Sequence, residues 1–428
     1  MSKAIDIPYI SRVEGKGALE IKVRGDRIED LKFRIYESPR FFEALLIGRR
    51  YYEVHEIVSR ICGICPVTHQ LTALKCIEKI IGLDVPEHIR NLRELMAIGG
   101  VISSHALHLF ALALPDYTGH PDIIAMAKDH PDIVKAGFRI KEVGDSLVEV
   151  IGGRSVHPVS TIVGGFTSIP TVERLRKFKE KLIEAKNLSL KYSSFISSLN
   201  YPEFERKCEH IAFYDKEEYP INYGIIKSTE GLELTEDEYR RWIYEVEVGY
   251  STAKHSYVRG RSSFMVGPLP RVNINYHNLS DEAKDTLSSS MFKFPCFNPF
   301  ASNIARFAEI LTLIDKAIGI IDEKPLEGRP RVEVKPRAGE ASAITEAPRG
   351  VNFHSYRIND EGIVTYASIA PPTCQNAANI EVDLLEYLKD YLDRSDEEIA
   401  HRSEMLVRAY DPCISCATHL LEVKISRM

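Results

Sequence analysis

The sequence predicts a mainly α-helical protein with small β elements, an α+β fold built around a central helical bundle. Long apolar or amphipathic stretches fill residues 61–200 and 280–410, and apolar residues recurring with the helical period indicate helices. Short alternating segments, typical of half-buried strands, lie at the margins and in the mixed region 201–279. The 428 residues can bury a large core as one domain or two, and we expect one domain.

The N-terminal region, residues 1–60, is expected to carry a β-hairpin. Residues 18–24 and 28–36 alternate in polarity around a Gly-Asp turn signal. Two further strands are predicted in RGVNFHSYRI and GIVTYASIA, on either side of the turn at 359–362. Residues 326–348 are rich in proline, glycine and charge, so we predict a loop there.

Composition excludes several classes of function. The net charge of −6 argues against nucleic acid as the main partner. The apolar stretch 87–114 contains histidines and arginines, so we predict a buried core helix there and no transmembrane segment. The first residues lack a secretory signal, and the cysteines form no disulfide pattern. We therefore expect a cytoplasmic protein.

Two Cys-x-x-Cys pairs lie near opposite ends of the chain, Cys62 with Cys65 and Cys413 with Cys416. Four thiolates brought together would suit a soft transition metal. Three interpretations are open: a redox dithiol, a structural zinc site, and a catalytic metal site assembled from both ends of the domain. Zinc ribbons usually hold their pairs within a short loop, whereas nearly the whole chain separates these pairs.

The residues around both pairs favour reactive thiolates. Pro66 disfavours a helical conformation for Cys65 and suits the first turn of the helix predicted after it. Cys65 would therefore lie at a helix N-terminus, where backbone dipoles lower the pKa of a thiol. Asp411-Pro412 before Cys413 has the same form.

These motifs resemble the large, catalytic subunit of nickel–iron hydrogenases. The resemblance runs along the chain in the blocks SRVEGKG, SPRFFE, SHALHLFALALPD, GGRSVHPVSTIVGG, EAPRG, PPTCQNAAN and RAYDPCISCATH, besides RICGICPVTH. It implies the fold of that subunit and reversible oxidation of H2 to protons and electrons. The blocks look most like the multisubunit class that couples H2 to NAD(P).

The resemblance also assigns the metal ligands. It implies a Ni–Fe centre whose iron carries carbon monoxide and cyanide. Cys62 and Cys413 would bind nickel terminally, while Cys65 and Cys416 would bridge nickel and iron. Thiolates suit this work because they are soft, strongly donating and able to bridge two metals.

Five further residues match catalytic positions of the family. Glu14 would relay the proton released from H2, and Arg349 would lie over the metals. Asp116 and Asp411 would lie beside the site and orient the arginine and the thiolate loop. His69, one helical turn after Cys65, would hydrogen-bond a thiolate. Without the resemblance, each has an ordinary alternative role in a turn, a cap or an ion pair.

Other family positions concern the cofactor and a second metal ion. Thr373 would donate its hydroxyl to a cyanide, with Pro372 packed beside it. Glu43 and His419 match ligands of a divalent ion, usually magnesium. The family's usual glycine in the SPRFFE block is replaced by Phe41, so this loop can differ.

The resemblance implies partners as well. Because no cysteine set remains for an Fe–S relay, we expect an Fe–S small subunit, with diaphorase or other electron-transfer subunits beyond it. A maturation endopeptidase would remove residues 420–428, a cleavable tail on the metal-binding segment 411–428. The rival hypothesis is a metal-free relative of the complex I large subunit with a coupling role. Both complete cysteine pairs argue against it.

Overall fold

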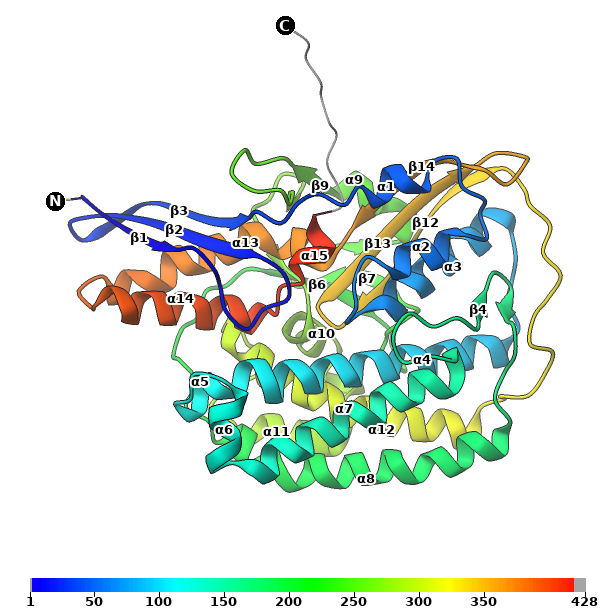
Figure 1. Cartoon of the computed structure of the whole chain (residues 1–428), viewed down its shortest axis with the longest axis horizontal. Helices are drawn as coiled ribbons and strands as arrows, with labels where there is room; N and C mark the ends of the chain where they lie inside the picture. The colour runs from blue at the N-terminus through cyan, green and yellow to red at the C-terminus, as the bar shows by residue number, and fades with distance from the viewer. Residues whose placement is uncertain (1, 419–428) are drawn as a thin grey trace, which may run out of the picture.

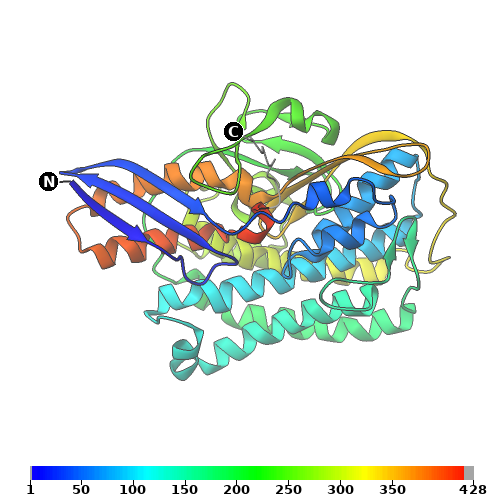
Figure 2. The same cartoon turned by 45° about the horizontal axis from the view of Figure 1, so that its top comes forward.

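Four long helices lie side by side and form the lower layer of the molecule (Figures 1 and 2). The computed structural model describes residues 2–418. The layer consists of α4 (Glu87–Ala106), α7 (Pro131–Gly152), α8 (Val172–Ser197) and α12 (Ser302–Glu323). Their facing sides are apolar and buried, as expected for packed amphipathic helices. The predicted helical bundle is confirmed.

Helix α4 does not end at Ala106 but continues through a π-helical segment, Leu107–Ala113, into α5 (Leu114–Thr118). The whole stretch Glu87–Thr118 is long and apolar enough to cross a membrane, yet 83% of its most apolar window is buried within the protein. It is the predicted core helix. Around this layer lie the shorter helices α6 (Ile123–Asp129) and α11 (Asp281–Ser288).

An antiparallel sheet of β12 (Gly339–Ala347), β13 (Gly350–Ile358) and β14 (Val364–Ala370) covers α3 (Pro66–Ile81). Strands β13 and β14 and helix α3 confirm the sequence prediction. The predicted loop at 326–348 is wrong for its last third, because β12 pairs with β13 over its full length. Its small and β-branched residues are buried between β13 and α3, and this tertiary pairing outweighs the glycine and charge of the segment.

The N-terminal sheet contains the predicted hairpin, β2 (Gly17–Arg24) with β3 (Arg27–Ile35), and an additional edge strand, β1 (Ser2–Ile7). Its inner face packs on α13 (Pro372–Tyr387). Glu381 of that helix accepts a hydrogen bond from the Phe33 backbone N–H at 2.8 Å. Helix α14 (Asp396–Tyr410) lies beside α13 and leads into the second cysteine pair.

The mixed region 201–279 forms a second, smaller core. Its sheet has the order β11-β6-β7-β8, and a separate hairpin pairs β9 with β10. The elements are β6 (Glu209–Tyr214), β7 (Ile225–Ser228), β8 (Glu233–Leu234), α9 (Tyr239–Trp242), β9 (Ile243–Val246), β10 (His255–Val258), β11 (Phe264–Met265) and α10 (Pro268–Asn275). A two-strand ribbon of β4 (Thr161–Ile162) and β5 (Gly165–Phe166) precedes α8.

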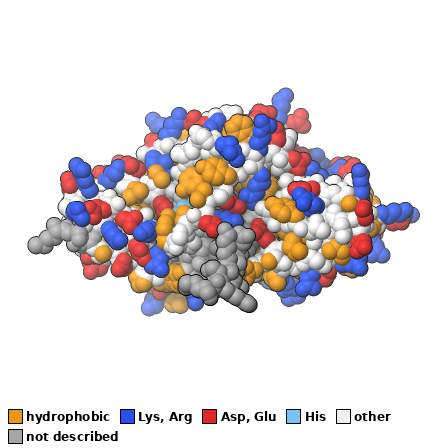
Figure 3. All heavy atoms as spheres, turned by 90° about the horizontal axis from the view of Figure 1, so that it is seen from above, with side chains coloured by type: hydrophobic (Ala, Val, Ile, Leu, Met, Phe, Trp, Pro, Cys, Tyr) orange, Lys and Arg blue, Asp and Glu red, His pale blue; other side chains and the backbone are white. Residues whose placement is uncertain are grey.

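Three short helices lie near the meeting point of the chain's two ends: α1 (Phe42–Leu46), α2 (Val54–Ser59) and α15 (Ile414–Ala417). Figure 1 shows α15 between the N-terminal sheet, α13 and the β12–β14 sheet. The face above them carries charged side chains of both signs with apolar groups between them (Figure 3).

Helices α4 and α7 approach each other through glycines, which yields a test of the packing. A Cβ atom at Gly144 would lie 2.6 Å from the carbonyl oxygen of Gly99 and 2.6 Å from the backbone nitrogen of Ser103. We expect Gly144→Ala to lower the free energy of unfolding by about 1–3 kcal/mol through overpacking. Gly319→Ala, in α12, meets no atom within 4 Å and should instead raise it by about 0.5–1 kcal/mol. Chemical denaturation measures both; equal effects would contradict the packing account.

Candidate metal centre

The structure brings the four cysteines of the two pairs into one buried cluster. Their sulfur atoms all lie within 4.8 Å of one another. The Sγ atoms of Cys62 and Cys413 are 3.3 Å apart, and those of Cys65 and Cys416 are 3.6 Å apart. Each pair thus contributes one member to each close contact, an arrangement in which two metal ions can share thiolates from both ends of the chain.

Local backbone geometry sets the position of the first pair. Cys65 is the N-cap of α3, with Pro66 in its first turn, as predicted. The backbone N–H groups of Ile64 and Cys65 point at the sulfur of Cys62, at 3.2 and 3.5 Å. These donors and the helix N-terminus favour a charged sulfur at this position.

The second pair is fixed to the N-terminal segment. Glu14 and Cys413 form an isolated parallel β-bridge, and the Ile414 N–H donates to the Glu14 carbonyl oxygen at 3.0 Å. The α15 turn that follows places Cys416 next to Cys413. The two ends of the chain therefore meet through backbone hydrogen bonds as well as through the thiols.

The four thiols do not share charge equally. The pKa of Cys65 lies well below the usual thiol value because Cys413, Cys416 and Cys62 hydrogen-bond to its sulfur; burial opposes this, and His69 adds a further hydrogen bond. Burial holds the pKa of Cys413 and Cys416 well above that value. One thiolate stabilised by its neighbours is the expected state of a buried thiol cluster without a counter-cation.

Arg349 and Asp411 form a buried ion pair beside the cluster. The Arg349 Nη2 and Nε atoms donate to the Asp411 carboxylate at 3.0 Å and to its carbonyl at 2.8 Å. Burial disfavours the guanidinium charge, but Asp411 and the cysteine sulfurs outweigh it and hold the pKa of Arg349 well above its ordinary value. Arg349 Nη1 and Asp411 Oδ2 are buried without a protein hydrogen-bond partner. Such atoms are polar groups available to a bound cofactor.

Thr373 lies at the start of α13, directly after Pro372, and both residues are buried. Its hydroxyl oxygen accepts the Cys413 backbone N–H at 2.8 Å. The hydroxyl proton is left to donate elsewhere, so the predicted bond to a cofactor ligand is compatible with this contact.

Glu14 is half-buried, between the buried cysteines and the surface. Its Oε2 accepts the Ser415 backbone N–H at 3.0 Å. Ser415 lies between the two cysteines of its pair, so the Glu14 carboxylate is fixed against the thiolate loop.

Asp116 contacts other arginines than the one expected from the sequence. Its carboxylate accepts two hydrogen bonds from Arg408, at 2.7 and 2.9 Å, and pairs with Arg12. It therefore joins the segments that lead to Glu14 and to Asp411 and makes no described hydrogen bond to Arg349. The expectation that Asp116 orients Arg349 directly is corrected: the carboxylate is already occupied by two closer cations.

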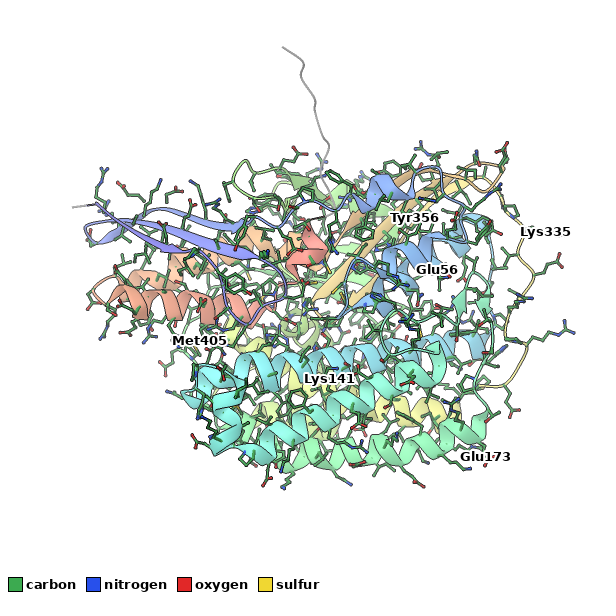
Figure 4. All side chains as sticks on the ribbon, viewed as in Figure 1. Glu56, Lys141, Glu173, Lys335, Tyr356 and Met405 are labelled. Carbon is green, nitrogen blue, oxygen red and sulfur yellow. The ribbon has the colours of Figure 1, made fainter. Side chains whose placement is uncertain are left out.

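His69 opens a chain of buried hydrogen bonds that sequence reasoning missed. Its Nδ1 lies 3.1 Å from His354 Nε2, and His354 Nδ1 lies 2.6 Å from the Tyr356 hydroxyl oxygen. Both new residues belong to β13, and Figure 4 labels Tyr356. Their alternation on a predicted strand was the available signal, because residues two apart share one face.

Glu43, predicted as a magnesium ligand, lies in α1 and accepts the Ile369 N–H at 2.6 Å. Burial raises the pKa of its carboxyl to about 7. The residue before α1, Phe41, has φ of 55°, in the left-handed region that favours glycine. The loop thus keeps the conformation of the glycine it lacks. His419 and the tail 420–428 lie outside the described residues.

Comparison with known proteins agrees with this site. The chain matches the family model of nickel-dependent hydrogenases over residues 40–137 and 212–419. The alpha subunit of sulfhydrogenase 1 from Pyrococcus furiosus is 37% identical over 425 residues, 98% of each chain. The vhu F420-non-reducing hydrogenase of Methanocaldococcus jannaschii has a polypeptide that is 32% identical, over 88% of this chain and 96% of its own length.

The chain belongs to the nickel-dependent hydrogenase family. Among solved structures, an NAD+-reducing [NiFe]-hydrogenase in the H2-reduced state aligns with a TM-score of 0.88 and 25% identity, over 97% of this chain and 99% of that one. The mainly helical fold with small sheets is that of a hydrogenase large subunit, as predicted. The intact four-cysteine cluster argues against a metal-free member.

The cluster fits the metals of this hydrogenase family. Four soft thiolate donors converge in a buried pocket, the ligand type that nickel and iron–thiolate centres require. Unpartnered polar atoms of Arg349 and Asp411 border the same pocket. Neither observation suits a redox dithiol, which uses a single pair.

The contact of Thr373 with the thiolate loop gives a prediction for the metal-free hydrogenase. Thr373→Val leaves the buried Cys413 N–H without an acceptor and should lower the free energy of unfolding by about 1–3 kcal/mol. Thr373→Ser retains the acceptor and should stay close to wild type. Chemical denaturation of both variants under reducing conditions checks this; equal stability of the Val variant and wild type would refute it.

Proposed function

We propose that this hydrogenase large subunit catalyses reversible oxidation of H2 at a Ni–Fe centre held by Cys62, Cys65, Cys413 and Cys416. The observation that carries the proposal is the convergence of four sulfurs within 4.8 Å. Cys62 and Cys413 are proposed as terminal ligands, and Cys65 and Cys416 as bridges. The centre, with carbon monoxide and cyanide on its iron, supplies the site of heterolytic H2 cleavage.

The protein's own part in the reaction is to move the proton. A cysteine sulfur, Cys413 or Cys416, takes the first proton, and Glu14 receives it and passes it outward. The contact of Glu14 with the Ser415 N–H supports this, because it holds the carboxylate on the loop that carries both sulfurs. The half-buried position of Glu14 joins a buried site to the surface.

Arg349, Asp411 and Thr373 are proposed to form the polar wall of the site. The unpartnered Nη1 of Arg349 and the free hydroxyl proton of Thr373 can donate to the diatomic ligands. Asp411 fixes the guanidinium by two hydrogen bonds. Pro372 packs beside Thr373 and, with the buried apolar surroundings, excludes water.

Electrons are proposed to leave through an Fe–S small subunit. Among the described residues, the other cysteines, Cys76, Cys208, Cys296 and Cys374, form no further group with metal-ligand spacing. The similar Pyrococcus chains are named alpha subunits, which implies partner subunits. We propose NAD(P) as the final acceptor, reached through diaphorase-type subunits, because the solved structure at TM-score 0.88 is NAD+-reducing.

Three remaining assignments belong to the same proposal. Glu43 is proposed to bind magnesium together with His419, and an endopeptidase to remove residues 420–428 after nickel insertion. A carboxylate with a pKa near 7 must lose its proton to bind a cation, so magnesium would displace that proton. A cytoplasmic location agrees with the eight free cysteines, which a reducing compartment preserves.

The proposal is tested on the anaerobically matured complex. We expect the purified protein to contain nickel and iron, and the complex to catalyse H2-dependent reduction of a dye. Cys65→Ser should lose both the metals and the activity. A nickel-free wild-type protein, or a Cys65→Ser variant with full H2 oxidation, would overturn the assignment.

Glu14→Gln gives a prediction for the proton step alone. Because Gln cannot carry a proton away, we expect H2 oxidation to fall by about 10²–10⁴-fold at unchanged nickel content. Glu404→Gln is the matched control: Glu404 is also half-buried and accepts a backbone N–H, from Ser11 at 2.9 Å. Dye reduction and H2/D2O exchange, with nickel analysis, measure the effect. Equal activity of the two variants would exclude Glu14 as the proton exit.

A further inference from the structure

One arginine contacts both cysteine segments from outside the thiol cluster. Arg40 lies in the segment between β3 and α1, and its Nη2 atom donates to the carbonyl oxygens of Ile61 and Ser415. Ile61 directly precedes Cys62, and Ser415 lies between the cysteines of the second pair. A single guanidinium therefore bridges the two loops that carry the metal ligands.

The backbone of Arg40 adds a third link. Its N–H donates to the carbonyl oxygen of Thr418 at 3.0 Å, just after α15. The guanidinium also lies over the ring of Phe42, 5.2 Å from its centroid. The side chain is thus held by a cation–π contact while it spans the two loops.

The segment that carries Arg40 is itself anchored. The Glu37 Oε1 accepts the Ser415 hydroxyl at 2.9 Å, and its Oε2 accepts the Lys16 N–H at 3.1 Å. Thr252 donates through its hydroxyl to the Glu37 carbonyl at 2.8 Å. We call Glu37 and Arg40 with the residues between them the loop clamp. Because it is tied to the mixed region through Thr252, it offers a fixed support and does not simply follow the cysteine loops.

The cysteine loops need such a support. Each is short and irregular, and mutual contact of four buried sulfurs is electrostatically unfavourable once more than one of them ionises. A metal ion rewards their approach only after it has bound. Contacts that hold the loops together beforehand lower the cost of ordering them and so raise metal affinity.

We propose that Arg40 is a positioning residue that holds the two cysteine loops at metal-binding separation before metal arrives. The inference deepens the proposed function, since it concerns the same four ligands. It does not require that the bound metals cleave H2. The planar fork of the guanidinium suits two carbonyl acceptors, whereas a lysine ammonium is a point donor on a flexible stem.

The test measures binding of Co²⁺ alone to the metal-free, full-length chain under anaerobic conditions. Co²⁺ bound to four thiolates gives a charge-transfer absorption, which reports the geometry of the site independently of hydrogenase activity. We expect Arg40→Gln to weaken Co²⁺ binding by about 10–100-fold, as groups that orient metal ligands do. Arg40→Lys should lie between Arg40→Gln and wild type. Unfolding midpoints of the metal-free variants should match that of wild type.

Arg261→Lys is the matched control. Arg261 also bridges two segments, donating to Glu209 Oε1 at 2.6 Å and to the Glu230 carbonyl at 3.3 Å, in the separate mixed region. It should leave Co²⁺ affinity unchanged. Unchanged affinity in Arg40→Gln would overturn the proposal. So would a loss of affinity accompanied by an equal loss in the metal-free unfolding midpoint, or a failure of both Arg40 variants to fold, because Arg40 would then act on general stability. Loss of H2 oxidation in the wild-type complex would refute the proposed function but not this result.

Discussion

Four buried sulfurs within 4.8 Å of one another impose the constraint on which the rest of this structure depends. Negative charge on them is costly in a low-dielectric interior unless cations and N–H donors surround it. The chain meets this requirement with the N-terminus of α3, the N–H groups that point at Cys62, the hydrogen bond from His69 and the guanidinium of Arg349. Each belongs to a different part of the sequence, so the pocket acquires its electrostatics only when the whole domain is folded.

The same constraint explains the architecture around the pocket. Because the two pairs come from opposite ends of the chain, the fold must bring both ends to one point and hold them there. The helical layer of α4, α7, α8 and α12 provides a rigid support, on which α3 and α13 present their N-terminal ends to the site. The β-bridge between Glu14 and Cys413 and the loop clamp then close the pocket from the N-terminal side.

Sequence reasoning located the residues whose chemistry is local. The cysteine pairs, the helix start at Cys65 and the β2–β3 hairpin depend on neighbours in the chain, and the structure confirms them. It failed where tertiary contacts decide. Strand β12 was read as loop because its partner β13 is what stabilises it. The partners of Asp116, the His354–Tyr356 chain and the bridging role of Arg40 depend on which distant segments meet, and no local pattern encodes that. Phe41 departed from the family glycine in sequence but not in backbone conformation.

The charges behind the pocket do not cancel, and this asymmetry supports a site built for anionic sulfur. Asp411 faces two buried arginines, Arg349, with which it pairs, and Arg306. Burial lowers the pKa of Arg306 to about 10, which still leaves it a cation at neutral pH. Its Nε and Nη2 atoms have no described hydrogen-bond partner. His108 beside them is neutral, since burial and Arg306 hold its pKa well below the usual value. One carboxylate against two guanidiniums leaves a net positive charge there, and thiolates bound to metal are the groups it would stabilise.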